Sequence, residues 1–486
     1  MTQQEVFERA RRSRDARFDG QFYIGVRTTG IYCRPICPAN TPKSENVTFF
    51  QTAAAASEAG YRPCLRCRPE CAPGTPAWSG TSTTVRRGLK LIANGALDNS
   101  NVEDLATRLG VTSRHLRRLF NRHLGASPLA VAHTQRLHFA KQLIDQTRLP
   151  LQDIALAAGY GSVRRFNDSF VKTYGRSPRE LRHAGRESTD AEPGTTLTVR
   201  LYYRSPFDWR TLLAFFSARA TPGVESIEGD LYRRTVTVDG QNGVIELRPD
   251  GGNVLLALRG IGTQSIFPVV QRCREMFDLD APVQEIAEVL SRDPVLERLI
   301  ASNPGVRVPG AWDGFELAVR AVLGQQISVK AATTIAGRIA NAYGEAATDL
   351  GGSGLARLFP LPNRLAHARF NNMGITRSRA ATLRRLAQAV ADGSLCFDAA
   401  QDPVAFRESL LAIPGIGEWT AQYVAMRALK NPDAFPAADL GLLRAFDHPG
   451  RPRLKPAQLE EMSQAWRPWR AYAALLLWGS APGSGG

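Results

Sequence analysis

The spacing of the hydrophobic positions changes along the chain. Between residues 85 and 183 they recur at three- or four-residue intervals, as in the run 102–109, which is typical of helices. Between 197 and 282, runs such as TLTVRLYY and GVIELRPD are β-branched and partly alternating, which is typical of strands separated by turns. From Val283 onward the helical spacing returns. The pattern predicts a helical middle, then strands, then a second helical part.

Two segments separate these patterns. Residues 72–84 (APGTPAWSGTSTT) are rich in Pro, Gly, Ser and Thr, and residues 184–196 (AGRESTDAEPGTT) are polar, so both have the composition of linkers. A chain of 486 residues is also too long for a single hydrophobic core. We therefore expect a multidomain, mainly α protein with a small α+β module over 1–71, an all-α domain over 85–183, a strand-rich α+β subdomain over 197–282 and a helical domain over 283–480.

The positive charge of the chain is concentrated in its first part. Residues 1–190 hold 29 Lys and Arg against 16 Asp and Glu, a balance of +13, whereas residues 191–486 hold 32 against 29, a balance of +3. Excess arginine neutralises phosphates and releases counterions, so this distribution predicts a nucleic-acid-binding first part. A solubilising basic surface is the alternative.

No part of the sequence indicates a membrane segment. The N-terminal MTQQEVFERARRSRDARFDG is polar and charged, without the apolar stretch of a secretory signal. No later stretch approaches the roughly 18 uninterrupted apolar residues of a membrane span. We expect a cytoplasmic, nucleoid-associated protein.

Five of the seven cysteines lie between residues 33 and 71. Three residues separate Cys33 from Cys37, and two separate Cys64 from Cys67. Such pairs in a reducing compartment favour one tetrahedral Zn²⁺ held by four thiolates over disulfides. Cys71 is then left over as a nearby thiol. A purely structural zinc is the simplest interpretation of this pattern.

The residues around these cysteines resemble a known family. The runs GIYCRPICPA and YRPCLRCRPE, and about residues 18–70 as a whole, are similar to the Ada-type zinc domain. The resemblance implies that Cys33 accepts methyl groups from methylphosphotriesters in DNA. Zinc keeps the sulfur of such a cysteine deprotonated and nucleophilic. Methylation then removes one negative charge from a site of net charge −2, which favours DNA binding. A zinc-stabilised architectural protein without methyl transfer is the alternative.

The helical middle contains two related units. NVEDLATRLGVTSRHLRRLFNRHLGASP and LQDIALAAGYGSVRRFNDSFVKTYGRSP start about fifty residues apart, and each ends in Gly-x-Ser-Pro. Each reads as a helix-turn-helix, and together they resemble the AraC-type DNA-binding domain, which implies promoter binding by two recognition helices and RNA polymerase as a partner. A solvated basic face is the alternative. The candidate DNA contacts on the second helix of each unit are Arg114, His115, Arg117, Arg118, Arg164 and Arg165.

The C-terminal part contains PGIG between two helical runs. Gly415 and Gly417 would let backbone N–H groups approach a DNA phosphate, as in a helix-hairpin-helix. About twenty residues on, PAADLGL places Asp439. With GFELAVRAVLGQQISV (314–329) and WRPWRAYAALLLWGS (466–480), these runs resemble the helix-hairpin-helix DNA glycosylases, and the AlkA-type 3-methyladenine glycosylase in particular, over about 197–480. The resemblance implies that Asp439 is the catalytic carboxylate. A plain helix cap at Asp439 is the alternative, and Asp433 is a competitor for the catalytic role.

Several positions refine this implied chemistry. Trp419 stands where lyase-active relatives have a lysine, so no Schiff base can form and a monofunctional glycosylase is expected. Trp419, Tyr423 and Trp478 match the aromatic pocket for a flipped cationic base, although such residues are often plain core. Gln326 occupies the position of an apolar wedge that fills the gap in the duplex. No cysteine follows Cys396, so an iron–sulfur cluster is not expected.

The combined expectation is a fused sensor and repair enzyme for DNA alkylation that acts on double-stranded DNA. No PCHR motif of an alkylguanine methyltransferase is present, so transfer from O6-alkylguanine is not expected. The main alternative is a regulator whose glycosylase domain is inactive and only binds DNA.

Overall fold

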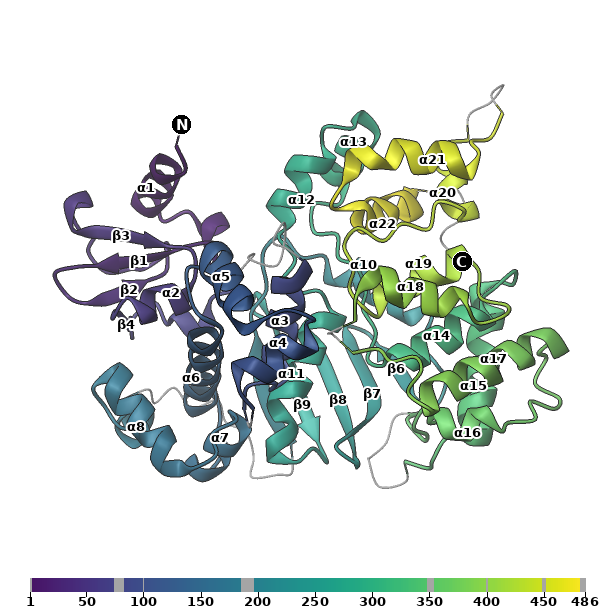
Figure 1. The fold of residues 1–486 in the computed structure, drawn as a ribbon, viewed down its shortest axis with the longest axis horizontal. Helices are drawn as coiled ribbons and strands as arrows, with labels where there is room; N and C mark the ends of the chain where they lie inside the picture. The colour runs from purple at the N-terminus through teal and green to yellow at the C-terminus, as the bar shows by residue number, and fades with distance from the viewer. Residues whose placement is uncertain are drawn as a thin grey trace. The chain divides into compact units, whose positions relative to one another are not determined.

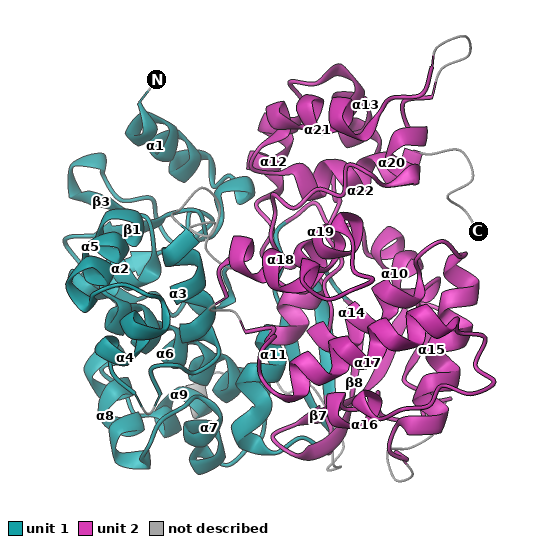
Figure 2. Ribbon diagram, turned by 45° about the vertical axis from the view of Figure 1, so that its right-hand side comes forward, with its two compact units in different colours: residues 1–204, 250–257, 261–271 teal, residues 205–249, 258–260, 272–486 magenta. Residues whose placement is uncertain are grey.

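The computed structural model describes residues 2–73, 83–98, 100–184, 196–347, 354–398, 401–447 and 452–480. Most of both expected linkers, at 74–82 and 185–195, lies outside the described residues. The chain forms two compact units, coloured separately in Figure 2. The first unit comprises residues 1–204, 250–257 and 261–271, and the second comprises residues 205–249, 258–260 and 272–486.

The first unit begins with a four-stranded sheet of order β3-β1-β2-β4 (Figure 1). Strand β1 runs antiparallel to β2 and β3, and β2 runs parallel to β4. Successive side chains of a strand point to opposite faces, so Phe22 and Ile24 enter one apolar cluster while Tyr23 and Tyr32 enter another. The elements are α1 (Gln3–Ser13), β1 (Tyr23–Val26), β2 (Ile31–Cys33), β3 (Val47–Phe50), α2 (Ala53–Glu58) and β4 (Arg62–Pro63).

The described part of the middle domain is helical, as the spacing predicted. The repeated Gly-x-Ser-Pro has a clear local role: α5 and α8 end at Gly125 and Gly175, each with φ of 66°, a left-handed conformation that glycine adopts without strain. Ser127 then caps α6 by accepting from the N–H of Ala130. The helices are α3 (Thr83–Ala93), α4 (Val102–Arg108), α5 (Ser113–Leu124), α6 (Pro128–Gln146), α7 (Leu151–Ala157), α8 (Val163–Tyr174) and α9 (Pro178–Ala184).

The expected strand-rich segment follows. In the second unit, β7 pairs antiparallel with both β6 and β8. The β7–β8 turn is Asp239-Gly240, with φ of 49° and 75°, the left-handed pair that a tight hairpin requires. The elements are β5 (Thr196–Leu201), α10 (Trp209–Ser217), β6 (Glu225–Glu228), β7 (Leu231–Val238), β8 (Gln241–Asp250), β9 (Asn253–Arg259) and α11 (Ile266–Met276).

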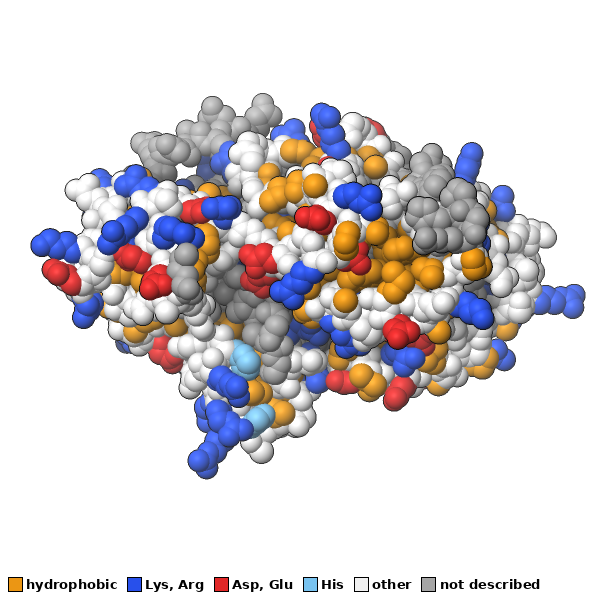
Figure 3. Space-filling view, turned by 90° about the horizontal axis from the view of Figure 1, so that it is seen from above, with side chains coloured by type: hydrophobic (Ala, Val, Ile, Leu, Met, Phe, Trp, Pro, Cys, Tyr) orange, Lys and Arg blue, Asp and Glu red, His pale blue; other side chains and the backbone are white. Residues whose placement is uncertain are grey.

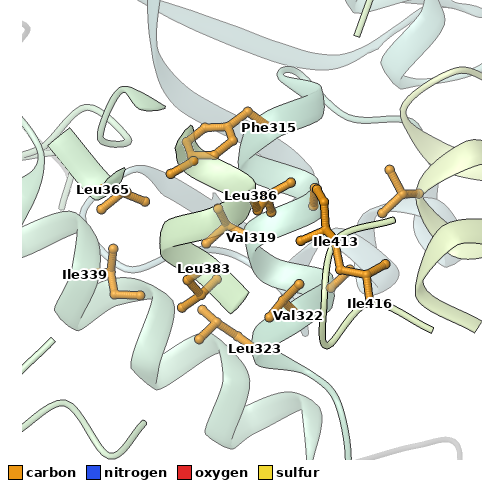
Figure 4. Close-up of a cluster of buried hydrophobic side chains, with 14 of the residues drawn as sticks. Phe315, Val319, Val322, Leu323, Ile339, Leu365, Leu383, Leu386, Ile413 and Ile416 are labelled. Carbon is orange, nitrogen blue, oxygen red and sulfur yellow. The ribbon is translucent and has the colours of Figure 1, made fainter. Parts of the chain in front are cut away.

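The rest of the second unit is helical and contains two apolar clusters. Helix α14 is buried along most of its length and forms the centre of the first cluster, shown in Figure 4. Ile413 and Ile416 enter the same cluster, so they anchor the PGIG hairpin to it. The helices are α12 (Val283–Leu290), α13 (Pro294–Ser302), α14 (Gly314–Leu323), α15 (Val329–Tyr343), α16 (Pro362–Ala366), α17 (Arg377–Ala391), α18 (Pro403–Leu411), α19 (Glu418–Arg427), α20 (Leu440–Arg444), α21 (Pro456–Ser463) and α22 (Arg470–Ser480).

The second cluster lies around α22 and α12, and Tyr423 packs against both clusters. This position places α19 at their junction. Among the described helices, none has both the length and the apolar character needed to cross a membrane. The multidomain, mainly α fold with small sheets is confirmed.

Candidate metal centre and candidate active site

The four paired cysteines converge at one end of the first sheet. Cys33 is the last residue of β2, and Cys64 directly follows β4. Because β2 and β4 are parallel neighbours, both cysteine pairs begin at the same end of the sheet. The sulfur atoms of Cys33, Cys37, Cys64 and Cys67 all lie within 4.8 Å of one another. Cys71 is buried nearby and is not part of this cluster.

The chemistry of this donor set fits a single zinc ion. Hydrogen bonds with the other three thiols, together with burial, raise the pKa of Cys33 in the absence of a cation. Four thiolates at this separation therefore require a neighbouring positive charge, which a divalent ion supplies. Four soft sulfur ligands in a compact group are the set that Zn²⁺ prefers in tetrahedral sites.

Arg34 supports the cluster from its backbone and its side chain. Its N–H donates to the sulfur of Cys67 at 3.3 Å, and its guanidinium donates to the carbonyl of Cys67 at 3.0 Å. Nε of Arg34 also donates to Asp19 at 2.8 Å, which fixes the guanidinium in place. Hydrogen bonds to a bound thiolate disperse its charge and hold its orientation.

A hollow of about 570 Å³ opens beside the cluster and is lined by Cys33, Cys37 and Cys64, of which Cys33 and Cys37 are half-buried and Cys64 is buried. Among the described residues, no Asp or Glu lines it. Glu8 and Asp19 pair with Arg11 and Arg34, and the other four lining arginines give the hollow an excess of positive charge, which suits an anionic DNA backbone. Sequence reasoning did not select these arginines, although those flanking the cysteines were visible in the motif. The arginines that line the hollow are Arg11, Arg14, Arg34, Arg62, Arg66 and Arg176.

The candidate recognition helices expose the expected basic residues. On α5, Leu116 and Phe120 are buried while Arg114, Arg117 and Arg118 are exposed and His115 is half-buried. On α8, Arg164 and Arg165 are exposed opposite the buried Phe166 and Phe170. Figure 3 shows Lys and Arg side chains in blue projecting from one face of the molecule, at one place beside pale-blue His side chains. This exposure leaves the basic side chains of α5 and α8 able to contact DNA.

Some of these basic residues already have partners. Arg117 pairs with Glu103 at 3.0 Å, and Arg118 contacts Nδ1 of His115 at 2.9 Å. Both contacts lie on the exposed surface, where an ion pair contributes little to stability, so a phosphate can replace them at low cost.

Asp439 lies where α19, α20 and α22 meet. The indole N–H of Trp419 donates to its Oδ2 at 2.6 Å, and the indole N–H of Trp478 donates to its Oδ1 at 2.8 Å. Asp439 is also the N-cap of α20, because Oδ1 accepts from the N–H of Leu442 at 3.0 Å. Asp439 is therefore a helix cap, as the alternative proposed, and capping does not exclude a chemical role for its carboxylate.

The aromatic residues form a wall beside this carboxylate. The rings of Trp419 and Tyr423 are stacked, with centroids 5.3 Å apart and an interplanar angle of 12°, and Trp478 lies 6.2 Å from Tyr423. Arg427 donates to the hydroxyl of Tyr423 at 2.6 Å. Burial alone would raise the pKa of Tyr423, but the charges of Arg427, Arg219 and Arg320 outweigh it and lower that pKa.

Asp433, the competing aspartate, is committed elsewhere. Nε of Arg470 donates to its Oδ1 at 2.7 Å, and Arg467 lies 3.2 Å from its Oδ2. This pairing ties the start of α22 to the loop before α20. Of the two aspartates, Asp439 is the one that faces the aromatic wall.

The PGIG hairpin has the conformation that its glycines predict. Gly415 has φ of 95°, and a Cβ there would lie 2.0 Å from the Oγ1 of Thr382. Gly417 caps α19, and a Cβ there would meet no neighbour within 4 Å. The open side at Gly417 lets a phosphate approach the N-terminus of α19.

Gln326 and its neighbour belong to the same surface as the hairpin. Gln326 is exposed, with φ of 56°, in the turn between α14 and α15. Gln325, which sequence reasoning missed, donates its amide to the carbonyl of Gly415 at 3.0 Å and to Thr420 at 2.9 Å. The bond from Gln325 therefore fixes the turn that carries Gln326 against the hairpin.

Family models match most of the chain in the order that the sequence predicted. Residues 7–70 match the metal binding domain of Ada, and residues 105–184 match a helix-turn-helix domain. Residues 198–313 match the AlkA N-terminal domain, and residues 319–471 match the HhH-GPD superfamily of base excision DNA repair proteins. These matches confirm the resemblances drawn from the motifs.

Curated relatives match the whole chain or one of its parts. The chain is 43% identical over 473 residues to "Probable bifunctional transcriptional activator/DNA repair enzyme AlkA" of Mycobacterium tuberculosis, covering 97% of this chain and 95% of the relative. It is 34% identical to DNA-3-methyladenine glycosylase 2 of Escherichia coli, over 57% of this chain and 95% of that protein. Bifunctional transcriptional activator/DNA repair enzyme Ada of Escherichia coli is 33% identical over 36% of this chain and 47% of its own length.

One solved structure shares the fold of the C-terminal part. The 3-methyladenine DNA-glycosylase from Archaeoglobus fulgidus aligns with a TM-score of 0.50 and 21% identity, over 58% of this chain and 97% of that one. At this identity the comparison speaks for the fold alone.

Proposed function

Because this chain belongs to the family of bifunctional transcriptional activator/DNA repair enzymes that join an Ada metal-binding domain to an AlkA-type glycosylase, we propose that it both senses and repairs DNA alkylation. The second unit excises alkylated purines of the 3-methyladenine type as a monofunctional glycosylase. The observation that carries this function is Asp439, a carboxylate held beside an aromatic wall.

The chemistry of excision follows from charge. Alkylation at N3 or N7 makes a purine cationic, so the base leaves as a neutral molecule that takes the electron pair of the glycosidic bond. The positive charge that develops on the deoxyribose is stabilised by the Asp439 carboxylate, and water adds its hydroxyl to C1′ and releases a proton. The ring faces of Trp419, Tyr423 and Trp478 attract the flipped cationic base.

The position of Trp419 supports a glycosylase without lyase activity. An indole nitrogen is not basic and cannot attack C1′ as an amine does, so the product is an intact abasic site. The hairpin at Gly415 and Gly417 holds the DNA backbone, and Gln326 in the adjacent turn enters the gap that the flipped base leaves.

The first unit supplies the sensor in this proposal. Cys33, Cys37, Cys64 and Cys67 would hold one Zn²⁺, which keeps the Cys33 sulfur a nucleophilic thiolate. That sulfur attacks the methyl carbon of a methylphosphotriester, a new S–C bond forms, and the O–C bond breaks to leave an ordinary phosphodiester. The arginines of the hollow hold the phosphate while the methyl group moves.

Methyl transfer then changes the affinity for DNA. The cluster loses one negative charge, so its repulsion of the phosphate backbone falls. The helix-turn-helix units bind promoter DNA through Arg114, His115, Arg117, Arg118, Arg164 and Arg165, and RNA polymerase is the partner that activation requires.

An Asp439→Asn variant tests the repair activity. On methylated duplex DNA, wild-type protein should release free 3-methyladenine, and the variant should be at least about 100-fold slower because the charge is lost and the shape is kept. Asp433→Asn is the matched control and should stay near the wild-type rate. Equal release by Asp439→Asn and wild type would reject Asp439 as the catalytic group. No release from any protein would favour a regulator whose glycosylase domain only binds DNA.

Mass spectrometry tests the sensor. After incubation with DNA that carries methylphosphotriesters, the peptide with Cys33 should gain one methyl group, while the peptide with Cys71 should not. If Cys33 stayed unmodified in zinc-loaded protein, the methyl-acceptor role would be rejected and the zinc would have a structural role only.

A further inference from the structure

The two indole N–H groups at Asp439 occupy positions that base stacking does not explain. Stacking uses the faces of a ring, whereas these contacts are made in the ring plane, at 2.6 Å from Trp419 to Oδ2 and 2.8 Å from Trp478 to Oδ1. Both tryptophans are half-buried, which leaves part of each ring surface open.

The hydrogen bonds at Asp439 leave little freedom to its carboxylate. A carboxylate offers about four lone-pair sites. Oδ1 accepts from Trp478 and from the N–H of Leu442, and Oδ2 accepts from Trp419. Among the described residues these are the donors that reach it, so a site on Oδ2 stays open. Rotation about the Cβ–Cγ bond would break all three bonds together.

The packing around Asp439 reinforces this constraint. A Cβ placed on Gly441 would lie 2.9 Å from Oδ1 of Asp439 and 3.1 Å from Cδ1 of Trp478, so the side chains fill the space at the start of α20. Trp419 is fixed in turn by its stack on Tyr423, whose hydroxyl accepts from the buried Arg427. The donors are therefore held by the fold.

We infer that Trp419 and Trp478 are positioning residues for Asp439, whose indole N–H groups fix the carboxylate so that the open site on Oδ2 faces the sugar or the attacking water. This inference rests on the proposed glycosylase function. It gives the two tryptophans a role separate from stacking on the base, since a donor fixed before the reaction needs no reorganisation in the transition state. At position 419, the hydrogen-bond donor of Trp419 takes the place of the lysine that serves as the amine nucleophile in lyase-active relatives.

Trp419→Phe and Trp478→Phe test the inference in the full-length protein, because phenylalanine keeps an aromatic face and lacks the N–H. Trp466→Phe is the matched control: this fully buried tryptophan of the same unit donates to Asp293 at 3.0 Å, away from Asp439. Steady-state release of 3-methyladenine and of 7-methylguanine, measured at increasing concentrations of methylated DNA, gives kcat and KM.

The expected result is a fall in kcat of about 10-fold to 100-fold for each of the first two variants, the range for losing a hydrogen bond to a charged group. KM should stay within about 2-fold, the loss should be similar for both bases, and Trp466→Phe should keep the wild-type kcat. Similar thermal unfolding of the three variants would show that the difference is not one of folding.

Other outcomes overturn the inference. Wild-type kcat in both variants would show that the N–H groups do not position Asp439. A rise in KM alone, or a loss that differs strongly between the two bases, would show that the rings act only by stacking. Absence of release by the wild-type protein would instead reject the proposed glycosylase function, and the inference with it.

Discussion

Tyr32 and His138 join the cysteine module to the helical domain: the hydroxyl of Tyr32 lies 2.9 Å from Nε2 of His138. Tyr32 is fully buried and directly precedes Cys33, and His138 is on α6. The same helix contributes Lys141, which pairs with the buried Glu70 of the module at 3.5 Å. Helix α6 therefore packs on the cysteine module within the first unit.

Burial, together with the charge of the nearby His133, lowers the pKa of His138 from a usual 6.5 to about 4. In this pH range the unfolded chain binds a proton at His138 and the folded chain does not. The free energy of unfolding should therefore be highest above about pH 6.5 and fall as the pH drops toward 4. The loss should reach at most about 3 kcal/mol, at about 1.4 kcal/mol per unit of pKa. Urea titrations at pH 7.5 and pH 5 measure it. In His138→Gln, which cannot titrate, the drop between these pH values should be smaller; an equal drop would contradict the assignment.

Removing one of the four clustered thiols should remove the metal. Cys64→Ala leaves three sulfurs, and a structural zinc site is closed by four ligands, so most of the bound zinc should be lost. Cys71→Ala is the control, because Cys71 is buried close by and outside the cluster. Elemental analysis of the purified proteins should find about one zinc per chain in wild type and Cys71→Ala. Full zinc in Cys64→Ala, or its loss from Cys71→Ala, would refute the ligand set.

The hairpin should tolerate alanine at one glycine and not at the other. Gly415→Ala forces a φ of 95° on an L-residue and puts its Cβ 2.0 Å from the Oγ1 of the buried Thr382, so a loss of about 1–3 kcal/mol is expected, with weaker binding of undamaged duplex. Gly417→Ala meets no neighbour within 4 Å at φ of −101° and should stay within about 1 kcal/mol of wild type. Thermal unfolding and DNA titration report both effects. Equal stability of the two variants would show that the hairpin relaxes around the added methyl group.

A buried ion-pair network holds β7 against α14. Glu316 pairs with Arg234 at 2.8 Å and with Arg320 at 3.1 Å, and the side chain of Glu316 is 3% exposed. Glu316→Ala leaves two buried arginines to share one carboxylate, because Arg234 and Arg320 also pair with Glu225 at 3.8 Å and 2.9 Å, and it should cost about 3 kcal/mol. Glu228, which pairs with Arg233 at 3.1 Å and is 57% exposed, is the matched control.

The exposed pair should matter little. Glu228→Ala should change the free energy of unfolding by less than about 1 kcal/mol, because solvent screens its ion pair. Urea titration at neutral pH compares the two variants. A smaller loss for Glu316→Ala than for Glu228→Ala would mean that Glu225 alone balances the charge of the two buried arginines.

The sequence predicted the features whose cause is local. Gly125 and Gly175 end their helices in the left-handed conformation that their place before Ser-Pro implies. The two short-spaced cysteine pairs predicted one site of four thiols, and the sulfur atoms of Cys33, Cys37, Cys64 and Cys67 do lie within 4.8 Å of one another. The Asp439 motif likewise identified a carboxylate that the fold does place against aromatic rings.

Features that need distant segments to meet were not predictable. In the sequence, Gln325 is one of several polar residues in a turn, and only the fold shows that its amide donates to the carbonyl of Gly415. The in-plane contacts of Trp419 and Trp478 depend on the angle at which α19 and α22 meet α20, which no spacing encodes. The bond from Arg470 to Asp433 likewise joins residues 37 positions apart, which the sequence did not predict.

Arg176 lines the hollow beside Cys33, although it lies outside the zinc module of residues 1–71. It follows α8, so a polypeptide cut back to residues 1–71 would keep every thiol ligand and lose one of the cations that meet an incoming phosphate. Such a fragment could bind zinc normally and still accept methyl groups slowly. A methyl-transfer assay on such a fragment would then report a slow rate that comes from the loss of Arg176 and not from a poorly reactive Cys33.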